Sequence, residues 1–409
     1  MADRDTDILL IGGGIASATA AATLREEGFD GSVLLAGREL DPPYHRPPAS
    51  KGYLVGRESK ADALVHPDGW WEEHGVELRT RTGVMALDPA ARTATLQSKE
   101  KVGFGHALVA TGAMVRRLQV DGAQLDGIHY LRALGNADTI RGDVDGAEHV
   151  VCVGGSYIGS EVAASLRELG KRVTIVMQEA EPLERQFGAR AGAYFRSVLE
   201  GHGIDIVSAD EIARFESASG ATEGDGERVA RVVTAGGRTI EAGAVVCGVG
   251  AQPDVMLARR AGLALGDLGG VRCDSRLRTS AEQVFAAGDI CEYDSVVHGR
   301  VVRIEHEEVA AAQGATAARN MLGADAPHDV VPYFFSDLSD WAAIEYVGPA
   351  LSWDEDVVRG DIDSGPFAVW YLDGGRVRAA LSVDGAADLD RARELIASGE
   401  PVGAAGVPD

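Results

Sequence analysis

Apolar runs that end in glycine mark the first half of this chain. Residues 7–11 lead directly into a glycine triplet, and an alanine-rich stretch over 16–27 follows and stops at Gly28. A short apolar run before glycine is typical of a buried strand, and a glycine after a helical stretch is typical of a helix end. With a further apolar run at 32–36, the pattern predicts a strand–turn–helix–strand unit.

The same unit recurs in the middle of the chain. A strand is expected at 149–153, a helix at 157–169 that ends at Gly170, and a second strand at 172–177. Because the repeat comes as two long copies, it indicates a duplicated βαβ module and not a short-period solenoid.

The segments around these two units carry weaker patterns. Residues 37–53 are rich in proline and charge and predict an ordered loop without regular structure. Strands are expected at 105–111, 229–234 and 244–249. The polar, glycine-rich stretch 216–228 is interpreted either as a hairpin tip or as a mobile loop.

The last third of the chain changes character. An apolar strand over 284–289 ends in Gly-Asp, and a helix over 307–322 closes this part. From Pro332 onward, short alternating runs predict a small α+β domain. Its strands are expected at 341–347, 366–372 and 376–383, followed by a helix over 387–397 and a short disordered tail after Gly399.

Length and composition bound the class of protein. At 409 residues, with 45% hydrophobic and 25% charged positions, the chain predicts two or three globular domains. No apolar run reaches the roughly 18 residues that a membrane span needs. The start of the chain is polar and runs into a strand, which does not resemble a signal peptide. We therefore expect a soluble, cytoplasmic protein.

Charge and cysteine content narrow the chemistry further. The formal net charge of −24 disfavours nucleic acid and anionic membranes as partners, although it is also explained by solubility alone. The cysteines at 152, 247, 273 and 291 form no C-x-x-C motif. Cys152 and Cys247 fall inside apolar strand runs, so we expect buried structural thiols and not catalytic ones.

Both glycine turns have the pattern of a dinucleotide site. Glycines directly after a buried strand let the backbone approach a pyrophosphate at a helix N-terminus. The first site is expected to use Gly12, Gly14, Ile15, Ala16 and Ser17, with serine in place of the third fingerprint glycine. The second is expected to use Gly154, Gly155, Ser156, Tyr157, Ile158 and Gly159. Two such sites predict a flavin and a nicotinamide dinucleotide, and hence an electron-transfer enzyme.

Further motifs carry a resemblance to a known family. The turn Ala110-Thr111-Gly112 is followed by Arg116, a second strand ends in Gly288-Asp289, and a loop runs Pro43-Tyr44-His45-Arg46-Pro47-Pro48-Ala49-Ser50-Lys51. With these motifs the chain resembles the FAD-dependent ferredoxin reductases of the putidaredoxin reductase and biphenyl-dioxygenase ferredoxin reductase type, with apoptosis-inducing factor as a more distant relative. The resemblance covers nearly the whole chain.

The resemblance implies a glutathione-reductase-like fold of three domains. A split FAD-binding domain is expected over 1–113 and 243–328, and an NAD(P)H-binding domain over 114–242 is inserted into it. A C-terminal α+β interface domain is expected over 329–409.

The resemblance also implies the roles of individual residues. Arg46 is expected to touch the FAD pyrophosphate, and Lys51 to lie near flavin N5, where a cation favours reduced flavin. Glu161 is expected to pair with Lys51, although a glutamate in the first turn of a helix is also favoured by the helix dipole. Tyr157 is interpreted either as a gate over the flavin or as a core aromatic residue. Other implied FAD contacts are Ala110, Thr111, Gly112, Arg116, Gly288, Asp289, Glu305 and His306, and Val249 and Gly250 are implied beside NAD(P)H.

Besides Ser17, three positions depart from the family pattern. The acid that contacts the FAD ribose is expected near residue 38, where the chain has Arg38 and then Glu39. In the second unit that acid is replaced by Met177, followed by Gln178, and Glu179 then favours NADH over NADPH by repelling a 2′-phosphate. Phe335 stands where relatives have a tryptophan near the flavin.

These features together predict a function. No cysteine precedes Cys152, so thiol–disulfide chemistry at the flavin is disfavoured and the electrons must go to an outside acceptor. The resemblance implies an NAD(P)H-dependent reductase that passes hydride to FAD and then single electrons to a ferredoxin serving a cytochrome P450 or Rieske-type oxygenase. The alternatives are a monodehydroascorbate- or quinone-type NADH reductase, and an NADH-sensing flavoprotein like apoptosis-inducing factor.

The partner and the metal content have their own expectations. Because ferredoxins are usually acidic, docking requires a local basic patch. The candidates are Arg116-Arg117, Arg259-Arg260, Arg300 with Arg303, and Arg376 with Arg378. None of the ten histidines has metal-ligand spacing, so no metal site is expected.

Overall fold

A computed structural model describes residues 2–224, 226–348 and 350–408. The chain forms two compact units. The first consists of Met1–His45, Ala63–Met114 and Gln252–Phe334, and the second of Arg46–Asp62, Val115–Ala251 and Phe335–Asp409.

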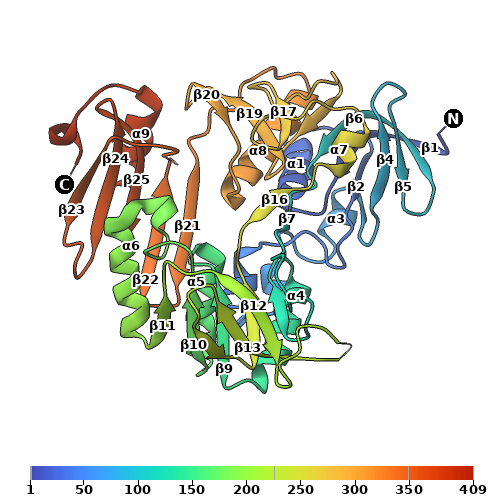
Figure 1. Cartoon of the computed structure of the whole chain (residues 1–409). Helices are drawn as coiled ribbons and strands as arrows, with labels where there is room; N and C mark the ends of the chain where they lie inside the picture. The colour runs from blue at the N-terminus through green and yellow to red at the C-terminus, as the bar shows by residue number, and fades with distance from the viewer. Residues whose placement is uncertain (1, 225, 349, 409) are drawn as a thin grey trace. The chain divides into compact units, whose positions relative to one another are not determined.

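The first unit is built on a mostly parallel sheet (Figure 1). Its strands β1 (Arg4–Ile11), β2 (Val33–Ala36), β3 (Val76–Arg79) and β6 (Lys101–Val109) lie in the order β3-β2-β1-β6, and β18 (Val284–Ala286) pairs with β6. All of these pairs are parallel. The antiparallel strands β4 (Val84–Asp88) and β5 (Thr93–Leu96) extend the sheet beyond β6. The apolar end of β1 is buried on both sides, as in doubly wound folds.

Two helices pack closely together in this unit. Helix α1 (Ile15–Glu26) follows the first glycine turn, and α8 (Glu307–Met321) lies against it. A Cβ on Gly314 of α8 would lie 2.1 Å from the carbonyl oxygen of Ala16, so the two backbones come too close for any side chain there. Ser17, where the fingerprint has glycine, is fully buried in α1.

The remaining elements of the first unit are short. They are α3 (Trp70–Glu73), α7 (Met256–Arg260), β17 (Val271–Cys273), β19 (Cys291–Ser295) and β20 (Arg300–Val302). The last three strands form a separate small sheet in the order β17-β19-β20. The chain passes between the units at α2 (Lys60–Ala63), β7 (Ala113–Val115) and β16 (Ala251–Pro253).

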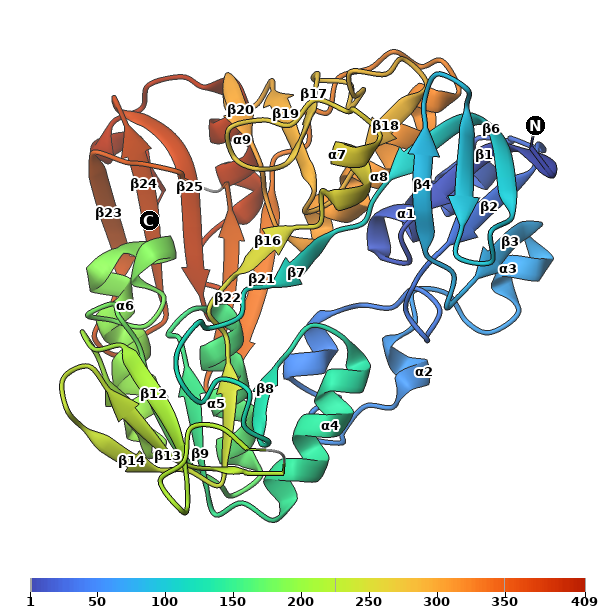
Figure 2. The same cartoon turned by 45° about the vertical axis from the view of Figure 1, so that its right-hand side comes forward.

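The second unit contains a fully parallel sheet, in the order β11-β10-β9-β15-β8. Figure 2 labels its strands β8 and β9. Its strands are β8 (Ile128–Tyr130), β9 (His149–Val153), β10 (Arg172–Val176), β11 (Ile204–Val207) and β15 (Ala244–Cys247). Helices α4 (Leu134–Asp145), α5 (Tyr157–Glu168) and α6 (Glu184–Gly201) connect them. Every residue of β9 and β15 is buried, which explains why both strands are continuous apolar runs.

A separate antiparallel sheet belongs to the same unit. It consists of β12 (Ile212–Ser217), β13 (Val229–Thr234) and β14 (Thr239–Glu241). Strands β12 and β13 pair from Ile212↔Thr234 to Ser217↔Val229, so the segment between them is a hairpin connection, as one of the two sequence interpretations has it.

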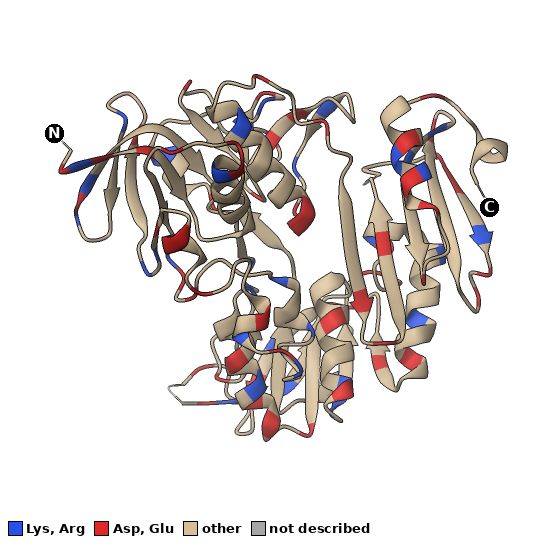
Figure 3. Cartoon of the chain, turned by 180° about the vertical axis from the view of Figure 1, so that it is seen from behind, with Lys and Arg blue, Asp and Glu red and all other residues tan. Residues whose placement is uncertain are grey.

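The C-terminal part of the second unit is a five-stranded antiparallel sheet with the order β21-β22-β25-β24-β23. It contains β21 (Tyr333–Leu338), β22 (Ala342–Val347), β23 (Glu355–Gly360), β24 (Phe367–Asp373) and β25 (Arg376–Val383), with α9 (Leu389–Ser398) against β25 and β22. Figure 3 shows acidic and basic positions interspersed on α9. They form the ion pairs Arg391–Glu394 and Arg393–Asp390.

Two expectations for the chain outside the motifs were wrong. The tail after Gly399 is not disordered, because it forms a 3-10 turn η2 (Ala404–Gly406), pairs through Pro401 with Arg376 and buries Val407. The loop 37–53 includes a 3-10 turn, η1 (Pro47–Ser50). The pattern also gave no sign of α4, α6, β21 or β23.

Other expectations are confirmed. The two strand–turn–helix–strand units are present with bounds within one residue of those expected, except that β1 begins three residues earlier, at Arg4. All four cysteines are free and buried. In the part of the chain that the structure describes, no helix is long and apolar enough to cross a membrane. The division into three domains stays a prediction.

Candidate functional site

The first glycine turn joins β1 to α1 and provides the N-cap of the helix. Gly12 has φ 123°, and a Cβ on it would lie 2.1 Å from the carbonyl oxygen of Ala110, so the turn needs glycine here. Gly14 is the N-cap of α1. In the described structure no side chain caps this end, and no acidic residue lies in the first turn. The free N–H groups of this turn and the helix dipole suit an anionic group.

Two further turns lie at the same edge of the sheet. Ala110, Thr111 and Gly112 follow β6, and Gly288 and Asp289 follow β18. Since β1, β6 and β18 are parallel neighbours, their carboxyl ends form the edge where open α/β sheets bind ligands. Thr111 donates its hydroxyl to the carbonyl of Asp254 at 2.8 Å, and the Gly288 amide donates to Gln313 Oε1 at 2.8 Å. The structure therefore brings together three of the motifs that the sequence separates.

Arg38 and Glu39 follow β2 at this edge. Glu39 accepts a 2.5 Å hydrogen bond from the Tyr44 hydroxyl, and Arg38 forms a 2.7 Å ion pair with Asp254. The carboxylate that suits a ribose diol is thus Glu39, whereas Arg38 is held by Asp254.

His306 directly precedes α8 and has a buried nitrogen without a partner. Its Nδ1 has no hydrogen bond among the described residues, and its ring lies 4.7 Å from that of Phe334. Burial lowers the pKa of His306 to about 4, with a smaller opposite effect of Asp289, so the imidazole is neutral near pH 7. Glu305 is instead paired with Arg303 at 2.5 Å.

These observations fit a dinucleotide such as FAD in the first unit. The bare helix N-terminus would take the pyrophosphate, Glu39 the ribose, and the orphaned His306 nitrogen a polar atom of the ligand, since buried polar groups need a partner.

The second glycine turn has the same construction between β9 and α5. Gly154 has φ 106°, and a Cβ on it would lie 2.3 Å from the carbonyl oxygen of Gly248. A Cβ on Gly159 would lie only 1.9 Å from the carbonyl oxygen of Gly154. Ser156 is the N-cap of α5, and as far as the structure is described its side chain makes no cap hydrogen bond. This turn is therefore open to a second dinucleotide.

The end of β10 lacks the usual ribose-binding acid, as the sequence indicates. Met177 is buried, and its sulfur lies where a Cβ on Gly155 would be, so it cannot reach a ligand hydroxyl. The next residue, Gln178, donates to Glu211 at 3.0 Å, and Glu179 pairs with Arg185. Two carboxylates, Glu179 and Glu211, thus lie at this strand end.

Tyr157 and Ile158 begin helix α5. The Tyr157 ring meets Phe187 edge to face at 5.9 Å, and burial raises the pKa of its hydroxyl well above the usual value, with smaller contributions from Tyr346 and Glu161. Both interpretations of Tyr157 remain, because a packed aromatic ring can also border a ligand.

Lys51 and Glu161 lie together in the second unit. Lys51 Nζ is 3.4 Å from Glu161 Oε1, and both side chains are at least 90% buried. The expected ion pair is therefore present. The alternative explanation for Glu161 was wrong in its premise, because α5 begins at Tyr157 and has no acidic residue in its first turn.

Three neighbours of this pair were missed from the sequence. Ser50 and Ser336 donate to Glu161, and Asp337 accepts from Lys51. Ser50 had a signal in its place beside Lys51 in the proline-rich loop, and Ser336 and Asp337 had one in their place directly after Phe335. Phe335 lies over Lys51, with Nζ 5.2 Å from the ring centroid.

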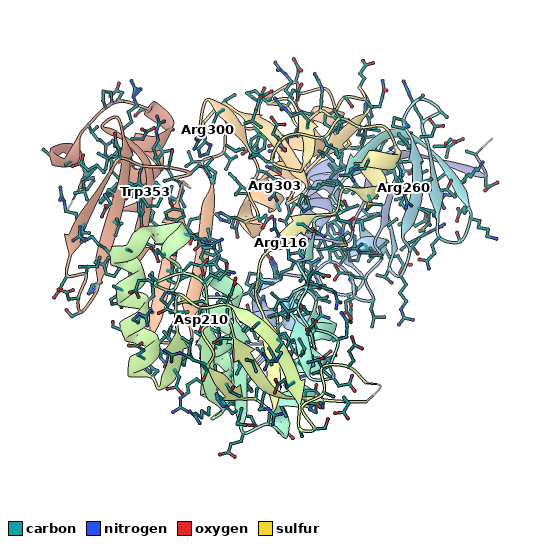
Figure 4. All side chains as sticks on the ribbon, in the orientation of Figure 1. Arg116, Asp210, Arg260, Arg300, Arg303 and Trp353 are labelled. Carbon is teal, nitrogen blue, oxygen red and sulfur yellow. The ribbon has the colours of Figure 1, made fainter. Side chains whose placement is uncertain are left out.

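The remaining predicted residues have protein partners. Arg46 donates to the carbonyl of Arg132 at 2.8 Å. Arg116, labelled in Figure 4, donates to the carbonyl of Ala251, and its amide donates to Gly250. Gly250 follows Val249 and has φ 95°, which requires glycine. The cofactor roles of all these residues stay predictions.

Two glycine turns on two parallel sheets, each with an uncapped helix end, define an oxidoreductase that uses two dinucleotides. Residues 6–314 match the family model described as pyridine nucleotide-disulphide oxidoreductase, and residues 333–409 match the reductase C-terminal model. The chain belongs to the pyridine nucleotide-disulphide oxidoreductase family, and within it to the ferredoxin reductases, which use FAD and NAD(P)H.

Individual relatives agree with this assignment. The chain is 35% identical to the 5,5′-dehydrodivanillate O-demethylase ferredoxin reductase subunit of Sphingobium sp., over 97% of this chain and 94% of the relative. Among solved structures it is similar to the ferredoxin reductase for the CYP199A2 system from Rhodopseudomonas palustris, with 29% identity, a TM-score of 0.92, and coverage of 99% and 97%. It is also similar to putidaredoxin reductase in its covalent complex with putidaredoxin, with 28% identity, a TM-score of 0.90, and coverage of 98% and 95%.

The similarity extends to a different kind of reductase. The monodehydroascorbate reductase of Arabidopsis thaliana is 30% identical over 98% of this chain and 84% of the relative. The sequence-based resemblance, the fold class and the two cofactors are confirmed by these comparisons.

Proposed function

We propose that this chain takes electrons from NADH and delivers them singly to a ferredoxin that serves an oxygenase, either a cytochrome P450 or a Rieske-type enzyme. The relatives named for oxygenase and P450 systems support this choice of acceptor. A covalent putidaredoxin complex of a structural neighbour supports an iron–sulfur protein as the direct partner. We place the reaction in the cytoplasm.

One observation carries the proposal: the second unit buries the Lys51–Glu161 ion pair, and Glu161 lies two residues after Gly159 of the dinucleotide turn. Bound FAD supplies a carrier that accepts two electrons together and releases them one at a time. Lys51 provides a positive charge that would offset negative charge developing on a bound cofactor, and Glu161 and Asp337 are its two counter-ions. Tyr157 begins the helix that carries Glu161.

The buried thiols support an outside acceptor. Cys152 lies inside β9 and Cys247 inside β15, and both are buried. Burial raises the pKa of Cys247 to about 12 and that of Cys152 further, so neither forms the thiolate that disulfide exchange requires.

The charges at the end of β10 support NADH as the coenzyme. Glu179 is matched by Arg185, whereas the only side-chain partner of Glu211 within the described part of the chain is the neutral Gln178. An unneutralised carboxylate at this position repels the 2′-phosphate of NADPH.

Two separate groups of exposed arginines in the first unit support an acidic partner. Arg259 and Arg260 on α7 and Arg300 on β20 are exposed and have no ion pair among residues 2–224, 226–348 and 350–408. Arg260 and Arg300 are labelled in Figure 4. The other candidate arginines have partners: Arg303 with Glu305, Arg378 with Asp373, Arg376 and Arg116 with backbone carbonyls, and Arg117 over the ring of Tyr130.

The test is NADH-driven reduction of cytochrome c by the purified holoenzyme, with and without a ferredoxin from the same cell. We expect stimulation by the ferredoxin of at least tenfold. Absence of stimulation by every ferredoxin of that cell contradicts the proposal.

A second candidate is favoured by one comparison. The similarity to a monodehydroascorbate reductase fits direct reduction of a small organic radical or a quinone. Turnover with monodehydroascorbate or quinone that exceeds turnover with ferredoxin would establish this alternative. Flavin reduction that takes many seconds at saturating NADH would instead indicate an NADH sensor.

A further inference from the structure

Lys51 lies between two carboxylates from different parts of the second unit. Its ammonium group donates to Asp337 Oδ2 at 2.8 Å, a normal hydrogen-bond length, whereas Glu161 Oε1 is 3.4 Å away. The direct hydrogen bond of the lysine is thus with β21, the first strand of the C-terminal sheet, and not with helix α5.

Glu161 has its own two donors. The Ser50 hydroxyl lies 2.5 Å from Oε2, and the Ser336 hydroxyl lies 2.6 Å from Oε1. Both serines are at most 3% exposed, and Ser50 is fixed in turn by a hydrogen bond from the Ser165 hydroxyl to its carbonyl. Each carboxylate oxygen therefore has a donor that does not depend on the lysine.

The charges of this cluster do not balance one to one. One ammonium group faces two carboxylates, and the side chains of Lys51 and Glu161 are only 10% and 7% exposed. A buried charge that loses its only partner is strongly destabilising, but a charge with two partners can lose either one. Removal of one carboxylate should therefore cost much less than removal of both.

We propose that Ser336 and Asp337 are positioning residues for electron transfer, and that Asp337 and Glu161 are interchangeable counter-ions of Lys51. Asp337 sets the place of the ammonium group, and Ser336 together with Ser50 sets the place of the Glu161 carboxylate. The functional part of this inference, the positioning role in electron transfer, rests on the proposed function. The structural part, that Glu161 and Asp337 are interchangeable counter-ions of Lys51, does not.

In this arrangement Lys51 and Glu161 are held in place by different partners. Because Glu161 is held by hydroxyl groups, it keeps its position when the ammonium group is drawn toward Asp337 or toward a ligand. Two consecutive residues of β21 thereby make the C-terminal sheet a component of the electron-transfer site, in addition to any part it has in docking.

The structural part is tested with a double-mutant cycle on the FAD-containing holoenzyme. The variants are Glu161→Gln, Asp337→Asn and the double variant, and the readout is the thermal midpoint followed by release of flavin fluorescence. We expect each single variant to lose no more than about 3 °C, and the double variant to lose at least about 4 °C beyond their sum.

The control is Asp340→Asn, which removes an exposed carboxylate just beyond β21. It should leave the midpoint unchanged and should add nothing to Glu161→Gln. Strict additivity of Glu161→Gln and Asp337→Asn would overturn the proposal, as would a Glu161→Gln variant as unstable as the double variant.

The positioning role is tested with Ser336→Ala and Ser336→Thr. Anaerobic stopped-flow mixing with NADH separates the limiting rate of flavin reduction from the Kd of NADH. We expect Ser336→Ala to lower the rate about fivefold to tenfold with an unchanged Kd and full FAD content, and Ser336→Thr to restore it to within twofold. Equal rates in both variants and the wild type would overturn this role.

A second readout follows the charge of Asp337. The midpoint potential of the bound flavin should rise in Asp337→Asn, because loss of a negative charge favours the reduced form, and it should return in Asp337→Glu. An unchanged potential in Asp337→Asn counts against the proposal. If ferredoxin does not accept electrons, the proposed function is wrong, but the result of the double-mutant cycle on the thermal midpoint is not affected.

Discussion

Glycine residues that look alike in the first turn have different physical tasks. Gly12 is required by the protein itself, because a side chain there would meet the carbonyl of Ala110. A Cβ on Gly14 would meet nothing within 4 Å, and its φ of −99° is available to any residue. The space in front of Gly14 is therefore free for a ligand and is not needed by the fold.

This difference leads to a matched pair of variants. Gly14→Ala should fold with the thermal midpoint of the wild-type apoprotein but bind FAD at least tenfold more weakly, because the methyl group occupies the approach to the helix end. Gly12→Ala should destabilise the apoprotein itself. Apoprotein melting and titration with FAD measure both effects. Wild-type FAD affinity in Gly14→Ala would show that the dinucleotide does not approach there.

His328 gives the first unit a dependence on pH. It is 2% exposed, its Nδ1 lies 3.0 Å from the Thr316 hydroxyl, and burial lowers its pKa to about 4. Because the folded pKa lies below the unfolded value, the unfolded chain binds the proton first as the pH falls. The contribution of His328 to stability is complete above pH 6.5 and is lost as the pH falls toward 4.

The wild-type protein should therefore lose on the order of 3 kcal/mol more stability between pH 6.5 and 4 than a His328→Gln variant. Urea unfolding at several pH values, followed for the apoprotein, measures the difference. Parallel pH profiles for the two proteins would mean that His328 is already protonated in the folded state or neutral in both states.

At the scale of single elements, the end of β10 carries the proposed preference for NADH. The residue expected to bind ribose, Met177, is turned into the core, and Gln178 with Glu211 takes its place at the surface of the strand end. Glu211 comes from the connection between β11 and β12, so its place could not be found from the βαβ pattern.

We expect Glu211→Gln to reduce the preference for NADH over NADPH by about tenfold, mainly through tighter binding of NADPH. A change of about tenfold is expected when one carboxylate near a 2′-phosphate loses its charge. Titration with 2′,5′-ADP and with 5′-ADP gives the same comparison without turnover. Glu148→Gln, before β9 at the opposite edge of the sheet, is the control and should change neither affinity.

Elements with a strong pattern were predicted well, and those with a mixed pattern were not. Strands β9 and β13 have the bounds that the sequence indicates, because their apolar residues run between clear breaks. Helix α6 was missed, since glycines interrupt it and Gly188 within it has φ 81°. Strand β23 has no fully buried residue, since its two end residues are exposed and the four between them are half-buried.

The functional site, too, could be predicted only in part from the sequence. The glycine turns and Lys51 could be found locally, because their chemistry depends on neighbours in the sequence. Ser336 and Asp337 belong to the cluster only through tertiary packing of β21, more than 170 residues from Glu161. Such contacts leave no periodic signal.

For the whole molecule, the net charge of −24 means that an acidic partner can dock only where the local charge is positive. An acidic partner is repelled at long range and held only where arginines are unpaired. Arg259, Arg260 and Arg300 meet this condition.

Arg259→Ala combined with Arg260→Ala should raise the KM for ferredoxin about fivefold to twentyfold and leave flavin reduction by NADH unchanged. Arg238→Ala, which removes an exposed arginine from the second unit, is the control and should alter neither. An unchanged KM in the double variant would move the docking surface away from α7.

The burial of every cysteine has a consequence for the life of the enzyme in the cell. Oxygenases release hydrogen peroxide when their cycles fail, and peroxide attacks accessible thiolates first. Because all four cysteines are buried, this reductase should retain its turnover after prolonged exposure to iodoacetamide or micromolar peroxide.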